Sequence, residues 1–294
     1  MAKKNKVRWE NQITAIQENV LRKLAQYKFL TLEQLLRFSD IGTTQYTYLW
    51  RQVTSLRDRQ KPLVGCNSYN TPNPRKGRVH SIYFLNPYGK KVLENEFGLD
   101  SNKIKFKTGK HQSITQYSHR LITVEYHIQL NEWAARSSKE VRDFISYYDT
   151  SSKKIDDTSL RSRLKIESKD GTSFTPDAAY YIECKNGHQQ FHLFELYNGS
   201  DLSFIMRQMD PHLESFINGD THNSFGLAKE PYFLTVLFRY ESVMIKFVEQ
   251  MRYKLKYKSI FNYILVNHID KPERIWEEEF FNSWVSISNK TTKF

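Results

Sequence analysis

The chain has 294 residues, of which 39% are hydrophobic and 26% are charged, which is the composition of an ordinary globular protein. It contains no run of about 18 apolar residues and no apolar segment behind the basic N-terminus. Both observations argue against a membrane span and a signal peptide, and we expect a cytoplasmic protein. The two cysteines, Cys66 and Cys184, are too far apart for a zinc ribbon and too few for a disulfide framework.

The excess of positive over negative charge lies in the first third of the chain. Residues 1–110 contain 21 Lys and Arg against 8 Asp and Glu, whereas residues 111–294 contain 23 against 24. A basic domain joined to a nearly neutral one predicts that the first contacts a polyanion and the second has another task. We expect a DNA-binding domain at 1–100, a lysine-rich linker at 101–116 and a second domain at 117–294.

The basic domain is predicted to begin with three helices. Residues 12–30 and 43–60 carry apolar residues at helical spacing, and Thr31 can cap a short helix between them. Two strands are expected at 62–69 and 79–85. Three helices followed by a hairpin is the order of a winged helix-turn-helix, a fold that binds DNA or, in other cases, protein partners alone.

The third helix is a candidate recognition helix for double-stranded DNA. Its apolar stripe is Leu49, Val53 and Leu56. The residues expected on the outward face are Gln45, Tyr48, Gln52, Ser55 and Arg59. Such side chains can hydrogen-bond to base edges and phosphates in a major groove. The wing between the two strands adds three cations suited to phosphate contacts, namely Arg75, Lys76 and Arg78.

The second domain is predicted to be a mixed α/β, or α+β, layered fold. A long helix at 117–135 comes first. The expected strands are 140–148, 173–183, 190–197, 232–240 and 261–269, and helices are expected at 201–217 and 241–255. Strands mixed with helices at this spacing form a sheet covered by helices.

The stretch "SFTPDAAYYIECKNGHQQFHLFELYNG" is expected to form a hairpin with an acid near each end, Asp177 and Glu195. If the turn consists of Asn186 and Gly187 alone, the two carboxylates lie on opposite faces of the sheet. If Lys185 joins the turn and Gly187 is left-handed, Asp177 falls directly opposite Glu195. The second register gives one coherent apolar face that ends in two acids, and we favour it.

Two adjacent carboxylates repel each other unless a proton or a cation lies between them. In an open polar site the expected cation is Mg²⁺ or Mn²⁺, which can promote phosphodiester cleavage. Glu125, on the long helix, is a candidate third ligand, although a marginal position facing water is the commoner case. The alternative without a site is that Glu195 forms an ion pair with Lys185 or Arg207.

At these residues the chain resembles the PD-(D/E)xK nuclease superfamily, through Pro176-Asp177, Glu195 and the helical acid Glu125. The winged helix followed by "SHRLITVEYHIQL", "TPDAAYYIE" and "FHLFELYNGS" is similar to the plasmid replication-relaxation family over residues 10–265. That family is related to the histidine-independent relaxases of mobile elements. The resemblance implies nicking of a plasmid origin in replication or conjugation.

The nuclease pattern has a lysine two residues after the glutamate, and here that position is Tyr197. A phenol cannot supply the fixed positive charge that stabilises the transition state. Arg207 or Lys185 could supply it instead, or Tyr197 could itself attack the phosphate as a covalent nucleophile. A strand tyrosine is more often core packing. His119 could assist, but the nine histidines are scattered and do not predict a histidine-bound metal.

The leading hypothesis is therefore a protein that binds a specific duplex origin and makes a metal-dependent nick. The alternative is a catalytically inactive nuclease fold that serves as an accessory DNA-binding factor and docks other replication or mobilisation proteins. A transcriptional regulator with a ligand-sensing second domain would fit the winged helix, but it gives no reason for the acids.

Overall fold

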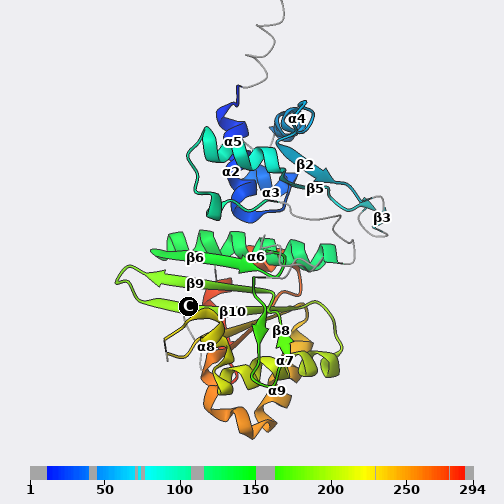
Figure 1. Ribbon diagram of the computed structural model, residues 1–294. Coiled ribbons are helices and arrows are strands. Elements are labelled where there is room, and N and C mark those ends of the chain that lie inside the picture. Colours follow the sequence, from blue (N-terminus) through cyan, green and yellow to red (C-terminus); the bar gives the residue numbers. More distant parts are fainter. Residues whose placement is uncertain are drawn as a thin grey trace, which may run out of the picture. The chain divides into compact units, whose positions relative to one another are not determined.

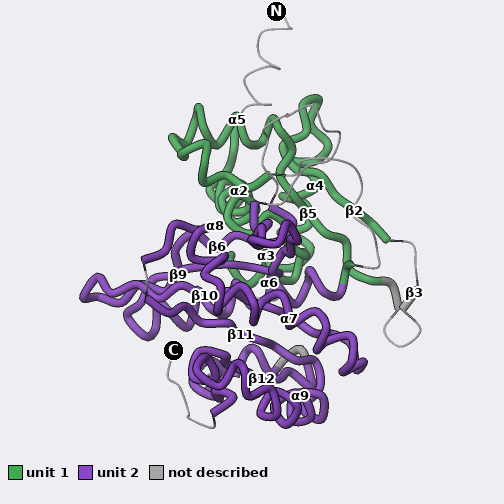
Figure 2. Tube along the Cα trace, turned by 60° about the horizontal axis from the view of Figure 1, so that its bottom comes forward, with its two compact units in different colours: residues 1–117 green, residues 118–294 purple. Residues whose placement is uncertain are grey.

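The computed structural model describes residues 12–39, 45–69, 72–73, 77–106, 116–149, 163–228, 230–277 and 279–288. For the pairs 72–73, 77–78 and 272–273 it describes the backbone alone. The chain forms two compact units, residues 1–117 and residues 118–294, which Figure 2 distinguishes by colour.

The first unit contains a small antiparallel sheet in the order β1-β5-β2 together with helices that precede, separate and follow its strands (Figure 1). Its elements are α2 (Ala15–Tyr27), β1 (Leu30–Thr31), α3 (Leu32–Arg37), α4 (Tyr46–Arg57), β2 (Val64–Asn67), β3 (Pro72–Asn73), β4 (Gly77–Arg78), β5 (Ile82–Leu85), α5 (Pro87–Asn95) and the 3-10 turn η2 (Ser101–Lys103). The three helices and the β2–β5 pairing agree with the sequence-based prediction. The short strand β1, which pairs with β5, was not predicted.

Local sequence explains where these helices begin. Thr31 is the N-cap of α3. Its hydroxyl accepts a hydrogen bond from the Gln34 amide, and the Gln34 side-chain oxygen accepts one from the Thr31 amide. This reciprocal capping confirms the predicted start. The predicted stripe of α4, formed by Leu49, Val53 and Leu56, is completely buried. It anchors the helix by one face and leaves the other in solvent.

The start of the expected linker is instead part of the first unit. Ile104 is buried there, and the Lys105 amide donates to the carbonyl of Ala25 in α2 at 2.8 Å. An apolar side chain and a backbone bond therefore hold this segment against α2. Lys107 and Lys110 lie outside the described residues.

The second unit is built on a six-stranded mixed sheet in the order β13-β12-β11-β10-β9-β6. Strands β10, β11 and β12 are parallel to each other, and the remaining pairs are antiparallel. The elements are α6 (Tyr117–Arg136), β6 (Lys139–Ser146), β7 (Ile166–Glu167), β8 (Ser173–Phe174), β9 (Ala178–Cys184), β10 (Gln189–Tyr197), α7 (Leu202–Asn218), α8 (Asp220–Phe225), β11 (Phe233–Phe238), α9 (Glu241–Tyr253), η4 (Leu255–Tyr263), β12 (Ile264–His268), η5 (Pro272–Trp276), η6 (Phe280–Asn282) and β13 (Val285–Ser286). The prediction of a mixed α and β fold is confirmed.

Buried side chains cover both faces of this sheet. On one face α7, α9 and η4 pack against strand residues that include Leu193 and Tyr197. On the other face α6 and residues 275–284 pack against strand residues that include Phe194 and Leu196. The alternation along β10 means that Glu195 faces the α7 side, together with Leu193 and Tyr197.

The predicted strand 173–183 is in fact two strands, β8 and β9. Pro176 lies between them, and proline has no amide hydrogen for a sheet ladder. The break places Asp177 immediately before β9, at the N-terminal end of an interior strand.

Among the described helices, none is long and apolar enough to cross a membrane.

Candidate active site

The β9–β10 hairpin brings Asp177 and Glu195 together. The strands pair Tyr181 with Phe191 and Ala178 with Phe194, and one further step in this register sets Asp177 opposite Glu195. At the other end, the amide of Cys184 donates to the carbonyl of His188 at 2.9 Å, and Gly187 is left-handed with φ of 79°. The three-residue turn is therefore confirmed, and the two-residue alternative is wrong.

Asp177 is fixed by two different partners. Its Oδ2 accepts a hydrogen bond from the Leu196 amide at 2.8 Å, so the carboxylate is tied to the neighbouring strand. Its Oδ1 lies 2.7 Å from Nε2 of His119, near the start of α6. His119, which the sequence analysis named as a possible aid to the acids, thus lies in contact with one of them. Both carboxylate oxygens are thus held in one orientation.

Glu195 is the buried member of the pair. Its side chain points toward α7, and its Oε1 lies 2.9 Å from Nε2 of His212. The two atoms are not aligned for a hydrogen bond, and Oε1 accepts none from the described residues. The predicted alternative, an ion pair of Glu195 with Lys185 or Arg207, is therefore not formed.

His212 was not predicted from the sequence. It lies on the buried face of α7, three residues after Met209 and seven after Ile205, so helical spacing was the available signal. A histidine within an apolar stripe is usually a core residue. Only packing of α7 against β10 shows that this one reaches Glu195.

Burial and mutual repulsion govern the proton affinity of the site. Burial, and secondarily the negative charge of Asp177, raise the pKa of Glu195 well above its usual value. Burial lowers the pKa of His119, but its contact with Asp177 outweighs this effect and raises the pKa overall. Burial lowers the pKa of His212 to about 4. Two neighbouring acids, one of them buried, therefore need a compensating proton or cation, and in its absence the raised pKa of Glu195 favours the proton.

The acid pair fits a hard divalent cation. A carboxylate oxygen that accepts no aligned hydrogen bond, beside a second carboxylate, is an arrangement that a bound cation would relieve. Asp177 and Glu195 would then contribute two oxygen ligands, and water could complete the coordination shell.

Glu125 does not point freely into a site. Its Oε1 accepts hydrogen bonds from Trp276 Nε1 at 2.6 Å and from Gln129 Nε2 at 3.4 Å. The side chain is buried, so the expectation of a marginal, water-facing position is wrong. Its carboxylate instead links α6 to η5.

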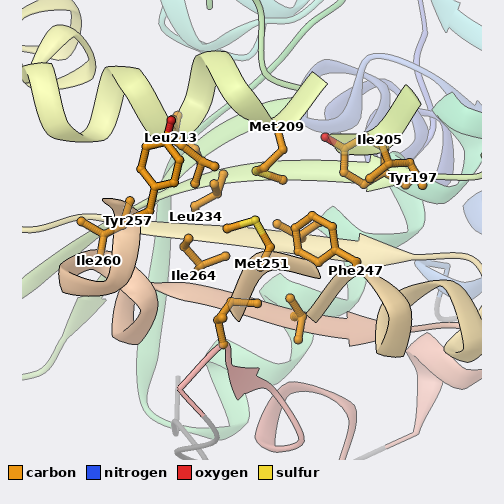
Figure 3. Close-up of a cluster of buried hydrophobic side chains, with 14 of the residues drawn as sticks. Tyr197, Ile205, Met209, Leu213, Leu234, Phe247, Met251, Tyr257, Ile260 and Ile264 are labelled. Carbon is orange, nitrogen blue, oxygen red and sulfur yellow. The ribbon is translucent and has the colours of Figure 1, made fainter. Parts of the chain in front are cut away.

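Tyr197 lies on the same face as the two acids, as predicted, but its ring is part of the core (Figure 3). The ring packs against Phe238 with centroids 5.7 Å apart. Burial, followed by the charges of Glu195 and Asp177, raises the pKa of the Tyr197 hydroxyl well above its usual value. In this environment the phenol is a weak nucleophile.

Neither of the two candidate cations is near the acid pair. Lys185 lies in the turn, eight residues along the strand from Asp177, which corresponds to about 26 Å. Arg207 is exposed on α7 and lies about 140° around the helix from His212, so it faces away from Glu195. The prediction that Lys185 or Arg207 supplies positive charge at the acid pair is therefore wrong. The strand register places Lys185 at the far end of the hairpin, and the position of Arg207 around α7 turns it away from Glu195.

A second group of possible ligands lies where β12 and α9 meet. Ligand atoms of Glu241, His268 and Asp270 are within 4.8 Å of one another. However, the guanidinium of Arg274 contacts the His268 ring, and Asp270 accepts a hydrogen bond from the Glu241 amide at 2.9 Å. His268 and Asp270 thus already have partners, and the Asp270 carboxylate accepts from the first amide of α9, so we interpret the group as supporting the start of that helix.

The predicted DNA-contacting residues of α4 are largely at the surface. Gln45, Tyr48 and Ser55 are exposed, and Gln52 is half-buried. Arg59 is an exception, because its guanidinium donates to the carbonyl of Gln12 at 3.2 Å and so joins the fold of the first unit. Of the wing cations, Arg75 and Lys76 lie outside the described residues, and for Arg78 the backbone alone is described, in β4.

Three exposed residues of α4 were missed by the sequence analysis. They are Tyr46, Trp50 and Arg51. Helical spacing could have found Arg51, because it lies opposite the Leu49, Val53 and Leu56 stripe.

Comparisons with known proteins give little further information. No family model matches the chain, and no curated protein matches it. Among solved structures, the SdaI restriction endonuclease aligns over 83% of this chain and 86% of its own, with 9% identity and a TM-score of 0.23. A score this low does not establish a common fold. The resemblance to the plasmid replication-relaxation family is not supported by any family match.

Proposed function

We propose that this protein binds double-stranded DNA through its first unit and cuts a DNA strand in a metal-dependent reaction at Asp177 and Glu195. The observation that carries the proposal is the acid pair. Two carboxylates lie opposite each other on adjoining strands, and the buried one has an oxygen without an aligned hydrogen bond. Such an arrangement needs a compensating cation or proton.

Asp177 and Glu195 would hold Mg²⁺ or Mn²⁺ through carboxylate oxygens. When bound, such a cation supplies an activated water and stabilises charge that develops on the phosphate. His119 and the Leu196 amide orient Asp177, so that one carboxylate is positioned before the cation arrives. Since the pKa of Tyr197 is raised, we propose water as the attacking group and a core role for the tyrosine.

For the first unit we propose a winged helix-turn-helix. The order of helices, the β1-β5-β2 sheet and the excess of positive charge in residues 1–110 support this assignment. In this proposal α4 enters the major groove and the wing contacts phosphates. The proposed DNA contacts are Gln45, Tyr48, Gln52, Ser55, Arg75, Lys76 and Arg78. The more specific proposal of a plasmid origin, with other replication or mobilisation proteins as partners, rests on the family resemblance alone.

A second candidate function is a DNA-binding accessory factor without nuclease activity. The position of Tyr197 favours it, because the residue at the lysine position of the nuclease pattern packs in the core. In this case the acid pair is stabilised by a shared proton instead of a metal ion.

Incubation of the full chain with supercoiled plasmid, in Mg²⁺, Mn²⁺ or EDTA, tests the proposal. We expect metal-dependent conversion to open circles. Asp177→Asn and Glu195→Gln should each lower the rate by more than about a hundredfold, because a metal ligand is lost.

Glu183→Gln is the matched control for this experiment. Glu183 is a carboxylate on the same hairpin, but it lies near the turn and pairs with Arg142 at 3.1 Å. We expect this variant to nick like the wild type. Binding of the plasmid without nicking in any metal would support the accessory factor, and nicking that survives both acid substitutions would contradict the assigned site.

A further inference from the structure

Helix α4 exposes three aromatic side chains within five residues. Tyr46, Tyr48 and Trp50 are 43%, 42% and 45% exposed, respectively. Large aromatic side chains contribute most to stability when buried, and a cluster of exposed ones often marks a binding surface. The buried stripe of the helix uses aliphatic residues, so these rings are not needed to anchor α4.

Two of these rings form a row. Tyr46 and Trp50 are four residues apart, so they are neighbours on one flank of the helix, with roughly 5–6 Å between their Cβ atoms. Arg51 is exposed on the side opposite the buried stripe, between this row and Tyr48, which it follows by three residues. Tyr48 lies on the other flank, near Gln52. The row Tyr46–Trp50 is therefore a separate feature from the polar groups proposed to read base edges.

The charge of the surrounding chain identifies the class of partner. Residues 1–110 carry 21 basic and 8 acidic side chains, which favours a polyanion over an apolar protein surface. In an intact duplex the bases present only their edges, whereas unpaired bases present flat faces on which aromatic rings stack. Aromatic rings beside an arginine on a basic domain suit nucleic acid with accessible base faces.

We propose that Tyr46 and Trp50 stack on unpaired bases, so that the preferred substrate is DNA with a melted or single-stranded segment. Arg51 would contact a phosphate of the same strand. This inference rests on the proposed DNA binding by the first unit. It is independent of whether the acid pair cuts the strand.

Fluorescence anisotropy with labelled DNA, in EDTA to prevent cleavage, tests the inference. The probes are a single strand of roughly 20 nucleotides, the matching duplex, and the same duplex with a central unpaired bubble. We expect the wild type to bind the single strand and the bubble more tightly than the duplex. Tyr46→Ala and Trp50→Ala should each weaken binding to these two probes about tenfold, with less than about a twofold change on the duplex.

Tyr253→Ala is the matched control, because Tyr253 is 86% exposed but belongs to the nearly neutral second unit. It should bind every probe like the wild type, and Trp50→Phe should restore most of the affinity lost in Trp50→Ala. Equal losses on duplex and bubble, or no loss on either, would overturn the inference. If the wild type binds none of the probes, DNA binding itself fails. If the wild type binds the probes but Asp177→Asn nicks supercoiled plasmid like the wild type in the separate cleavage assay, only the assigned nuclease site fails.

Discussion

His192 shows how strongly the core of the second unit constrains a titratable group. The ring is buried in β10 and stacks on Tyr180 and Phe233, each with a centroid distance of 5.1 Å. Burial, with a smaller contribution from Lys139, lowers the pKa of His192 from 6.5 to about 3. The folded protein therefore keeps this histidine neutral at a pH where the unfolded chain protonates it.

This difference predicts a loss of stability in mild acid. The contribution of His192 is complete above pH 6.5 and is lost as the pH falls from 6.5 towards about 3. Over this range the difference in protonation of His192 makes the unfolding free energy fall by about 1.4 kcal/mol for each pH unit of acidification. We expect the unfolding free energy of His192→Phe, obtained from urea unfolding at several pH values, to depend less steeply on pH than that of the wild type. His188→Phe, at an exposed position, is the control, and identical slopes in wild type and His192→Phe would contradict the assignment.

The candidate site shows which residues can be found from sequence. The pairing of Asp177 with Glu195 could be predicted because it depends on one turn and on strand alternation, both of which are local. The contact of His212 could not, because α7 brings this residue to Glu195 by tertiary packing. His119 was named as a possible aid to the acids, but its partner Asp177 could not be identified, because packing of α6 determines that contact. The buried position of Glu125 could not be predicted for the same reason, since its hydrogen-bond donor Trp276 lies 151 residues away in the chain.

At the scale of elements, the geometry of the site depends on the β9–β10 turn. Gly187 has φ of 79°, a conformation that costs other L-residues about 1–2 kcal/mol. No atom lies within 4 Å of the position that a Cβ would occupy, so Gly187→Ala introduces backbone strain without a clash. We expect this variant to lose about 1 kcal/mol of unfolding free energy in chemical denaturation.

Gly199 supplies the control for this prediction, because a Cβ there would also meet open space but its φ lies outside the left-handed region. Gly199→Ala should change the unfolding free energy by less than about 0.5 kcal/mol. If the two variants lose equal stability, the turn does not require a left-handed residue and the three-residue register needs another explanation.

Helix α4 shows what the spacing of apolar residues can and cannot predict. The stripe Leu49, Val53 and Leu56 was predicted correctly because each residue returns to the same side of a helix. The outward face was predicted less well. Arg59 lies beyond the end of α4 at Arg57, and its hydrogen bond to Gln12 depends on the neighbouring segment of the fold. Periodicity identifies which face is buried, but it does not identify the partners of long side chains near a helix end.

At the scale of the whole molecule, the two units differ in net charge. The basic residues in excess lie within the first 110 positions, whereas the remaining chain is nearly neutral. If the first unit carries the affinity for DNA, most of the ion release on binding must come from that unit. The salt dependence of binding therefore tests the division of labour between the two units.

Arg51→Gln tests this division at the exposed face of α4. Each phosphate contact contributes about 0.9 to the slope of log K against log salt concentration on duplex DNA, because a bound cation releases condensed counterions. We expect Arg51→Gln to reduce the slope of duplex binding by about 0.9, measured by anisotropy in EDTA over a range of salt concentrations. Arg207→Gln changes an exposed arginine of α7, in the nearly neutral unit, and should leave the slope unchanged. A reduced slope for Arg207→Gln would mean that the second unit also binds the phosphate backbone, and an unchanged slope for Arg51→Gln would remove this residue of α4 from the DNA interface.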